Sequence, residues 1–141
     1  MNGTILVPDA SVLLKWVLNS PDEEDARQAL ALRTAWVEGR YRLVVPSVWA
    51  YEVGNILGLK APGQAQALLS LLFALKMEEI SSGQIAEGAL DLMSRYGVTF
   101  YDAAYHAAAL LRDGTLVTAD SRYLERTASE GHAVLVRDWS R

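Results

Sequence analysis

Residues 4–18 carry the sequence TILVPDASVLLKWVL, in which two apolar patterns meet at one acidic residue. Residues 4–7 form a short, wholly apolar run, which is typical of a β-strand buried on both faces. Residues 11–18 place apolar side chains at the spacing of an α-helix. The stretch therefore predicts a strand, a turn that carries Asp9, and a helix, which is how a parallel α/β sheet begins.

The same alternation continues along the chain. Further strands are predicted at residues 41–45, 78–80, 115–118 and 133–136. Helices are predicted at residues 21–38, 47–59, 64–76, 82–95 and 102–112, with a short helix after Asp120. Strands separated by helices favour a three-layer α/β/α sandwich with a central, mainly parallel sheet. We find no repeat, low-complexity tract or long linker, so we expect a single domain over residues 1–141.

Composition excludes several classes of protein. Of the 141 residues, 51% are hydrophobic and 21% are charged, which is typical of a globular chain and excludes a disordered one. The net charge of −4 excludes a uniformly basic nucleic-acid binder, so any nucleic acid must be bound through a local basic patch or bound cations. The absence of cysteine excludes disulfides, thiolate zinc sites and thiol catalysis.

We expect a cytoplasmic protein that does not enter a membrane. The chain starts without the basic segment of a signal peptide. Its most apolar stretch, residues 67–75, is far shorter than the roughly 18 apolar residues of a membrane span. A cysteine-free composition also fits a reducing compartment.

Four acidic residues stand where a parallel sheet gathers its chemistry. Asp9 and Asp120 follow predicted strands, and Asp102 lies at the head of an alanine-rich helix. Each aspartate alone is explained by helix capping. Glu52 is harder to explain in this way, because helical spacing places it on or beside the apolar face of residues 47–59. Since the carboxyl ends of parallel strands share one edge of the sheet, these acids are candidates for one site.

Clustered carboxylates need a partner. Each raises the pKa of its neighbours, and a divalent cation removes the repulsion. Oxygen ligands without cysteine suit Mg²⁺ or Mn²⁺, which commonly take phosphate oxygens as further ligands. Such a site would activate a water molecule against a phosphodiester.

The acidic segments, taken in order, resemble the four motifs of PIN-domain ribonucleases. They are residues 7–12, VPDASV; residues 51–57, YEVGNIL; residues 101–105, YDAAY; and residues 116–120, LVTAD. The resemblance covers essentially the whole chain, whose length is similar to that of the VapC-type toxins of toxin–antitoxin pairs. It implies a PIN-like fold and Mg²⁺- or Mn²⁺-dependent endonucleolytic cleavage of RNA.

The resemblance also assigns roles to residues. It implies that the catalytic and metal-binding acids are Asp9, Glu52, Asp102 and Asp120. It implies supporting polar roles for Ser11, Asn55 and Thr118. Family members are usually homodimers that a small antitoxin protein inhibits.

The chain departs from the family pattern at two places. His106 stands where an aliphatic residue is more usual, and no second acid adjoins Asp120, which Ser121 and Arg122 follow. We expect His106 to be a partly buried, hydrogen-bonded histidine rather than a metal ligand.

Several other residues carry open alternatives. If exposed, Trp16 and Trp36 would form an apolar groove for a partner helix; otherwise they belong to the core. The arginines that lie in or after the segments of Asp102 and Asp120 either meet RNA phosphates or form a solvated face. They are Arg112, Arg122 and Arg126.

Two rival functions remain at this point. A catalytically inactive, PIN-like partner-binding module would keep the fold but bind no Mn²⁺. A phosphotransfer domain also uses aspartates at strand ends, but it needs a lysine late in the chain, and the last lysine is Lys76. Such a domain is therefore the weaker rival.

Overall fold

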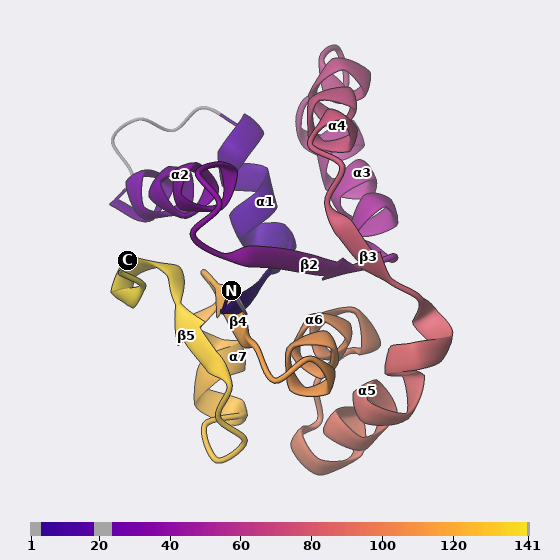
Figure 1. The fold of residues 1–141 in the computed structure, drawn as a ribbon. Helices are drawn as coiled ribbons and strands as arrows, with labels where there is room; N and C mark the ends of the chain where they lie inside the picture. Colours follow the sequence, from indigo (N-terminus) through magenta and orange to yellow (C-terminus); the bar gives the residue numbers. More distant parts are fainter. Residues whose placement is uncertain (1–3, 19–23, 141) are drawn as a thin grey trace.

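The computed structural model describes residues 4–18 and 24–140. Its centre is a parallel sheet of five strands in the order β3-β2-β1-β4-β5 (Figure 1). The strands are β1 (Ile5–Pro8), β2 (Arg42–Pro46), β3 (Glu78–Ile80), β4 (Thr115–Thr118) and β5 (Ala133–Leu135). Every strand lies within one residue of its predicted range at each end.

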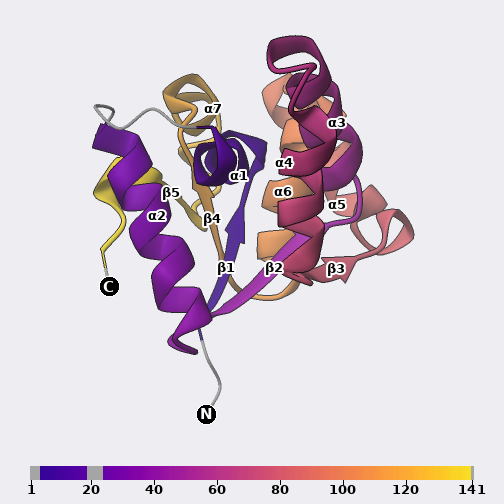
Figure 2. The ribbon, with the colours of Figure 1, turned by 90° about the horizontal axis from the view of Figure 1, so that it is seen from above.

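Helices cover both faces of this sheet. They are α1 (Ala10–Val17), α2 (Glu24–Val37), α3 (Trp49–Lys60), α4 (Ala65–Ala74), α5 (Ser82–Tyr96), α6 (Phe100–Leu111) and α7 (Ser121–Arg126), followed by a 3₁₀ helix, η1 (Val136–Asp138). In Figures 1 and 2, α1 and α2 lie on one face beside the paired helices α3 and α4, and α5 and α6 lie on the other. The predicted three-layer α/β/α sandwich is confirmed.

The central strands and α6 form the middle of the core. Leu6 and Val7 of β1 and Leu116 and Val117 of β4 are buried, as their buried-strand patterns predict. Helix α6 packs across β1, β2 and β4 through residues 103–109, which are all buried. Five of these seven residues are alanines. Small side chains let this helix approach the sheet closely, which brings its first turn to the strand ends.

The helix starts differ from the predictions in physically simple ways. Thr99, not Asp102, caps α6, because the Thr99 side chain accepts a hydrogen bond of 3.2 Å from the Asp102 backbone N–H. Asp102 therefore lies inside the first turn. Helix α3 begins at Trp49, and the Ser47 hydroxyl lies 3.3 Å from the Ser82 hydroxyl instead of capping it. The predicted start of the second helix at residues 21–23 lies outside the described residues.

Trp16 and Trp36 form an internal contact between α1 and α2. Their rings are stacked with centroids 6.2 Å apart, and the Trp16 indole donates a 2.8 Å hydrogen bond to the Ala29 carbonyl. Trp16 is buried and Trp36 is half-buried. The alternative in which the two rings line an open groove is therefore wrong.

The most apolar stretch, residues 67–75, belongs to α4 and the residue after it. Across residues 4–18 and 24–140, no helix combines the length and apolar character needed to cross a bilayer.

Candidate active site

The site lies where the chain reverses its direction of travel across the sheet. After β1 the chain builds β2 and β3 on one side, and it then returns to build β4 and β5 on the other. β1 and β4 are therefore neighbours, and a ligand crevice is expected beyond their carboxyl ends. Asp9 and Asp120 follow these two strands, and the Asp9 backbone N–H donates to the Val117 carbonyl at 3.1 Å.

Both strand-end aspartates are helix caps as well as site residues. Oδ1 of Asp9 accepts from the Val12 backbone N–H at 3.3 Å at the start of α1. Oδ1 of Asp120 accepts from the backbone N–H groups of Arg122 and Tyr123 at 3.0 and 3.1 Å. The capping interpretation and the site interpretation are therefore compatible, because capping fixes each carboxylate at a strand end.

Two hydroxyl groups tie the strand ends together. The Ser11 hydroxyl donates to Oδ1 of Asp9 and accepts from the Ala119 backbone N–H at 3.0 Å, which bridges the turns after β1 and β4. The buried Thr118 hydroxyl accepts from the Asp120 backbone N–H at 3.0 Å. Ser11 and Thr118 thus lie beside the acids at the positions that the sequence predicts for supporting residues.

One cavity brings the four acids together. It has a volume of about 170 Å³ and is lined by Asp9, Glu52, Asp102 and Asp120 with Ala10, Ser11, Leu14, Ile56 and Tyr105. Glu52 reaches it from the first turn of α3 and Asp102 from the first turn of α6. Asp120 is exposed at the rim, and the other three acids are half-buried.

The cavity disfavours negative charge. Burial raises the pKa of Asp9 from 3.8 to about 6, against the lowering effect of hydrogen bonds with Ser11, Thr118 and the Val12 backbone. Burial, reinforced by the charge of Asp102, raises the pKa of Glu52. Burial and the charge of Asp120 likewise raise the pKa of Asp102. A bound cation would reverse each of these effects, because it favours the ionised carboxylates.

The donor set fits a hard divalent cation. All four acids offer carboxylate oxygens, and the cavity lining contains no histidine. Within residues 4–18 and 24–140, no three histidine or acidic side chains converge closely enough to form a ready-made metal group. The carboxylates thus share the cavity without meeting at one point.

Tyr105 also lines the cavity, although the sequence analysis assigns it no role. Its hydroxyl donates a 2.8 Å hydrogen bond to Oε1 of Glu52, and the side chain is almost fully buried in the cavity wall. Tyr105 lies three residues after Asp102 on α6 and so faces the same way. A buried tyrosine hydroxyl needs a hydrogen-bond partner. The position of Tyr105 one helical turn after Asp102 was therefore the signal in the sequence that could have identified it.

Comparison with known proteins agrees with this arrangement. Residues 6–130 match the PIN domain family, a range that contains strands β2, β3 and β4, nearly all of β1, and the four acids described above. The chain belongs to the PIN-domain family.

Individual proteins are similar to this chain over most of its length. Over 131 residues, the chain is 32% identical to Ribonuclease VapC3 of Pyrobaculum aerophilum, with 86% of this chain and 93% of that protein aligned. Among solved structures it is similar to PAE2754 of P. aerophilum, with a TM-score of 0.68, 25% identity, and 96% and 91% of the two chains covered. It also shares its fold with a chain of a toxin–antitoxin complex from Klebsiella pneumoniae, with a TM-score of 0.67, 21% identity, and 93% and 97% covered.

Asn55 does not line the acidic cavity of this PIN domain. It is exposed, and Ile56 lines the cavity beside Glu52 instead. The buried residues of α3 are Trp49, Val53 and Leu57, and they fix the rotation of the helix about its axis. At about 100° per residue, Asn55 lies roughly 200° from Val53 and so faces away from the core. The structure thus gives no support to a polar role for Asn55 at the cavity.

His106 is a structural histidine, as the sequence analysis expects. It is fully buried; Nδ1 lies 2.8 Å from the Tyr123 hydroxyl and Nε2 lies 2.8 Å from the Gly131 carbonyl oxygen. A carbonyl only accepts, so Nε2 carries the hydrogen and Nδ1 accepts from Tyr123. Burial lowers the pKa of His106, which keeps the ring neutral. The ring joins α6 to α7.

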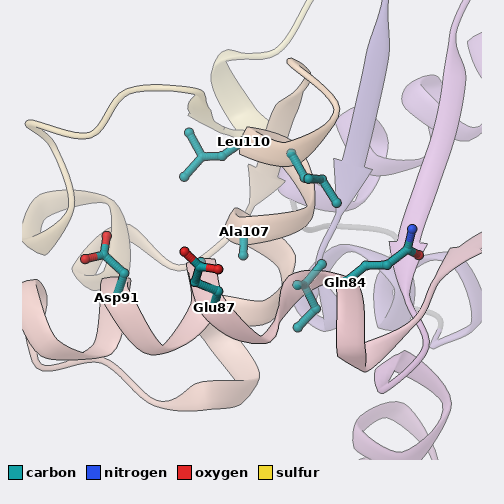
Figure 3. Close-up of a pocket in the computed structure, with 8 residues that line it drawn as sticks. Gln84, Glu87, Asp91, Ala107 and Leu110 are labelled. Atoms are coloured by element: carbon teal, nitrogen blue, oxygen red, sulfur yellow. The ribbon is translucent and has the colours of Figure 1, made fainter.

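A larger cavity elsewhere in the PIN domain contains none of the four acids. It has a volume of about 510 Å³ and lies between α5 and α6, with Gln84, Glu87 and Asp91 on one side and Ala107 and Leu110 on the other (Figure 3). Its two carboxylates, Glu87 and Asp91, are not joined by any buried, unpartnered side-chain polar atom among the described residues. The acidic cavity at the strand ends remains the candidate active site.

Proposed function

We propose that this PIN-domain protein is a Mg²⁺- or Mn²⁺-dependent endoribonuclease and the toxin of a toxin–antitoxin pair. One observation carries the proposal: the four acids come from four separate segments of the chain and line one cavity at the switch point of the sheet. The relation to Ribonuclease VapC3 over most of both chains supports RNA as the substrate.

The acids divide the work by position. Asp9, Asp102 and Asp120 would hold the cation, and Glu52 would complete the set or orient the attacking water. The ion would supply an activated water molecule and neutralise the charge that develops on the phosphodiester. Raised pKa values at Asp9, Glu52 and Asp102 support this role, because such carboxylates gain most from a nearby positive charge.

The surrounding residues would hold this geometry. The Ser11 hydroxyl fixes the Asp9 carboxylate, and the backbone N–H groups at the start of α7 fix that of Asp120. Tyr105 fixes Glu52 through its hydroxyl. Three carboxylates are thus pre-oriented by donors, which reduces the reorganisation needed at the moment of reaction.

Water attack on the RNA backbone has a defined product. Hydrolysis breaks the bond between phosphorus and the 3′-oxygen, so the products carry a 5′-phosphate and a 3′-hydroxyl. A 2′,3′-cyclic phosphate product would instead show that the ribose hydroxyl is the nucleophile and would contradict the proposed mechanism.

The partners follow from the same resemblance. We propose that the protein acts in the cytoplasm as a homodimer and that a small antitoxin protein inhibits it. Likeness to VapC-type toxins supports both partners. Light scattering of the purified protein measures the dimer, and co-expression with the product of an adjacent small reading frame tests the inhibitor.

The deciding experiment is cleavage of a total small-RNA preparation by the purified protein. We expect cuts with Mn²⁺, none with chelator, and none with Asp102→Asn. Asp113→Asn is the matched control, because it makes the same substitution at a highly exposed turn residue outside the cavity. Cleavage by Asp113→Asn but not by Asp102→Asn would assign the activity to the acidic cavity.

The outcomes separate the rival functions. Cleavage that survives chelator or Asp102→Asn would refute the metal-dependent mechanism. An inert wild-type protein that also binds no Mn²⁺ would favour the catalytically inactive partner-binding module.

A further inference from the structure

A second cavity adjoins the acidic one. Its volume is about 210 Å³, and it is lined by residues 97–99 at the end of α5, by Asp102, and by Asp120, Arg122, Tyr123 and Arg126 at α7. Asp102 and Asp120 line both cavities. A chain-like ligand that occupied both cavities would therefore pass over these two carboxylates.

Two guanidinium groups line this second cavity. Arg122 and Arg126 lie four residues apart in α7, so their side chains share one face of the helix. Both residues are exposed. Within residues 4–18 and 24–140, the Arg122 side chain makes no hydrogen bond or ion pair. Its donors are therefore available to a ligand.

One hydrogen bond positions the Arg126 side chain and leaves most of its N–H donors for a ligand. Its Nη1 donates a 3.0 Å hydrogen bond to the carbonyl of Gly97. Gly97 ends α5 in a left-handed conformation. A guanidinium has five N–H donors, so this contact leaves most of them to a ligand. The contact also fixes the position of the charge, which lowers the entropy lost on binding an anion.

Charge limits where RNA can approach. The net charge of −4 makes most of the surface unattractive to a polyanion. Arg112, a third candidate, donates to Oε2 of Glu78 at 3.0 Å, and Glu78 also pairs with Arg42. Arg112 caps the far end of α6, ten residues or about 15 Å along the helix from Asp102. Among the described residues, Arg122 and Arg126 are the arginines that line the cavity adjoining the acids.

We propose that this second cavity is a phosphate subsite for RNA. Arg122 and Arg126 would bind a backbone phosphate next to the one that is cleaved, because guanidinium groups match phosphate oxygens through paired N–H donors. The inference rests on the proposed ribonuclease function, and it assigns the direction in which the strand leaves the acids, towards α7. It separates these two arginines from Arg112.

The test is binding, measured apart from cleavage. The probe is a fluorescein-labelled oligouridine of about twelve nucleotides, in a buffer with Ca²⁺, and its integrity is checked on a gel. Fluorescence anisotropy gives the Kd from about 50 to about 200 mM salt. Wild type is compared with Arg122→Gln, Arg126→Gln and the control Arg112→Gln.

We expect Arg122→Gln and Arg126→Gln each to weaken binding about tenfold. Each should also reduce the slope of log Kd against log salt by about 0.7, the value for one lost contact to a single strand. Arg112→Gln should change neither quantity. Because the Arg122 side chain has no hydrogen-bond or ion-pair partner within residues 4–18 and 24–140, its substitution tests the subsite without breaking a described contact. Arg126→Lys keeps the charge but loses the paired donors, and it should bind more weakly than wild type.

The failures are distinguishable. If Arg122→Gln and Arg126→Gln match wild type in Kd and slope, or if wild type does not bind the probe, the subsite is wrong even where metal-dependent cleavage is present. If the arginine-dependent slope is found but no RNA is cleaved, the subsite holds as a phosphodiester-binding site and the ribonuclease proposal is wrong.

Discussion

At the scale of one residue, the Tyr105 hydroxyl holds a carboxylate inside an acidic cavity. Tyr105→Phe removes the 2.8 Å donor to Glu52, whose pKa that hydrogen bond lowers. We expect a loss of about 1–2 kcal/mol in the free energy of unfolding near neutral pH, measured by urea denaturation in chelator. Tyr51→Phe, at an exposed position of α3, is the control and should be neutral. Equal urea midpoints for Tyr105→Phe and wild type would show that the hydrogen bond contributes nothing.

Asp9 makes the stability of the metal-free protein depend on pH. Its folded pKa is about 6 against 3.8 when unperturbed, so the folded chain keeps this proton to higher pH than the unfolded chain. Its contribution is complete below about pH 3.8 and is lost as the pH rises through 6, a change of about 3 kcal/mol.

Asp9→Asn should remove this loss. An amide oxygen can still accept from Ser11 and Val12, so the cap survives. In chelator, we expect the variant to gain stability over wild type as the pH rises from about 4 to about 7.5, by up to about 3 kcal/mol. Denaturant unfolding at several pH values measures the difference, with Asp113→Asn as control. A difference that stays constant with pH would mean that Asp9 titrates normally.

The sequence could predict where the acids lie but not every neighbour of theirs. Strand ends and chain order are enough to bring Asp9 and Asp120 together, since both follow central parallel strands. The rotation of α3 about its axis depends on which apolar residues pack inward. That rotation turns Asn55 to solvent and Glu52 towards Tyr105. Such choices depend on tertiary packing, which spacing along one helix does not reveal.

At the scale of an element, β4 can lie beside β1 only because Gly114 has no side chain. A Cβ at Gly114 would lie 2.6 Å from the Ile5 carbonyl oxygen, which is backbone and cannot swing away. Gly114→Ala should therefore lower stability by about 2 kcal/mol or more, because the two strands must separate. Thermal unfolding measures the loss.

Gly58→Ala provides the opposite control for that prediction. Gly58 lies in α3, and a Cβ there would meet nothing within 4 Å. Alanine favours a helix by up to about 1 kcal/mol over glycine, so this variant should melt at or above the wild-type temperature. A Tm for Gly114→Ala equal to that of Gly58→Ala would contradict the close approach of β1 and β4.

At the scale of the whole molecule, a cation bound at the four acids should stabilise the fold by mass action. At a Mn²⁺ concentration about 100 times the Kd, the gain is about 2.7 kcal/mol, which corresponds to a rise in Tm of roughly 5–10 °C. Asp102→Asn should show a smaller rise but a higher Tm in chelator, because burial and Asp120 raise the pKa of Asp102 and so disfavour its charge. Differential scanning calorimetry measures both shifts. A wild-type Tm that does not change when Mn²⁺ is added would refute cation binding at this cavity.

The order of elements could be predicted across the described chain, and the helix starts less well. Apolar runs bounded by turns identify the central strands β1, β2 and β4, because buried parallel strands have no polar face. The edge strand β3 has two exposed glutamates and carries a weaker pattern. Thr99 and Asp102 are both good capping residues, so local chemistry alone could not choose between them. The 3₁₀ helix that takes Val136 from the last strand follows β5 at the sheet edge, where fewer ladder bonds hold the chain extended.

The pairing of β1 with β4 also determines when the acidic cavity can form during translation. Pro8 lies beside Val117, so the partner of the first strand is translated more than one hundred residues later. Until that segment leaves the ribosome, Asp9 has neither the Ser11–Ala119 bridge nor Asp120 nearby. The nascent chain therefore lacks the complete acidic cavity for most of its translation, next to the RNA-rich ribosome that makes it. Under the proposed function, a stop codon anywhere before β4 would yield an inactive product, and ribonuclease activity would begin only with nearly finished chains.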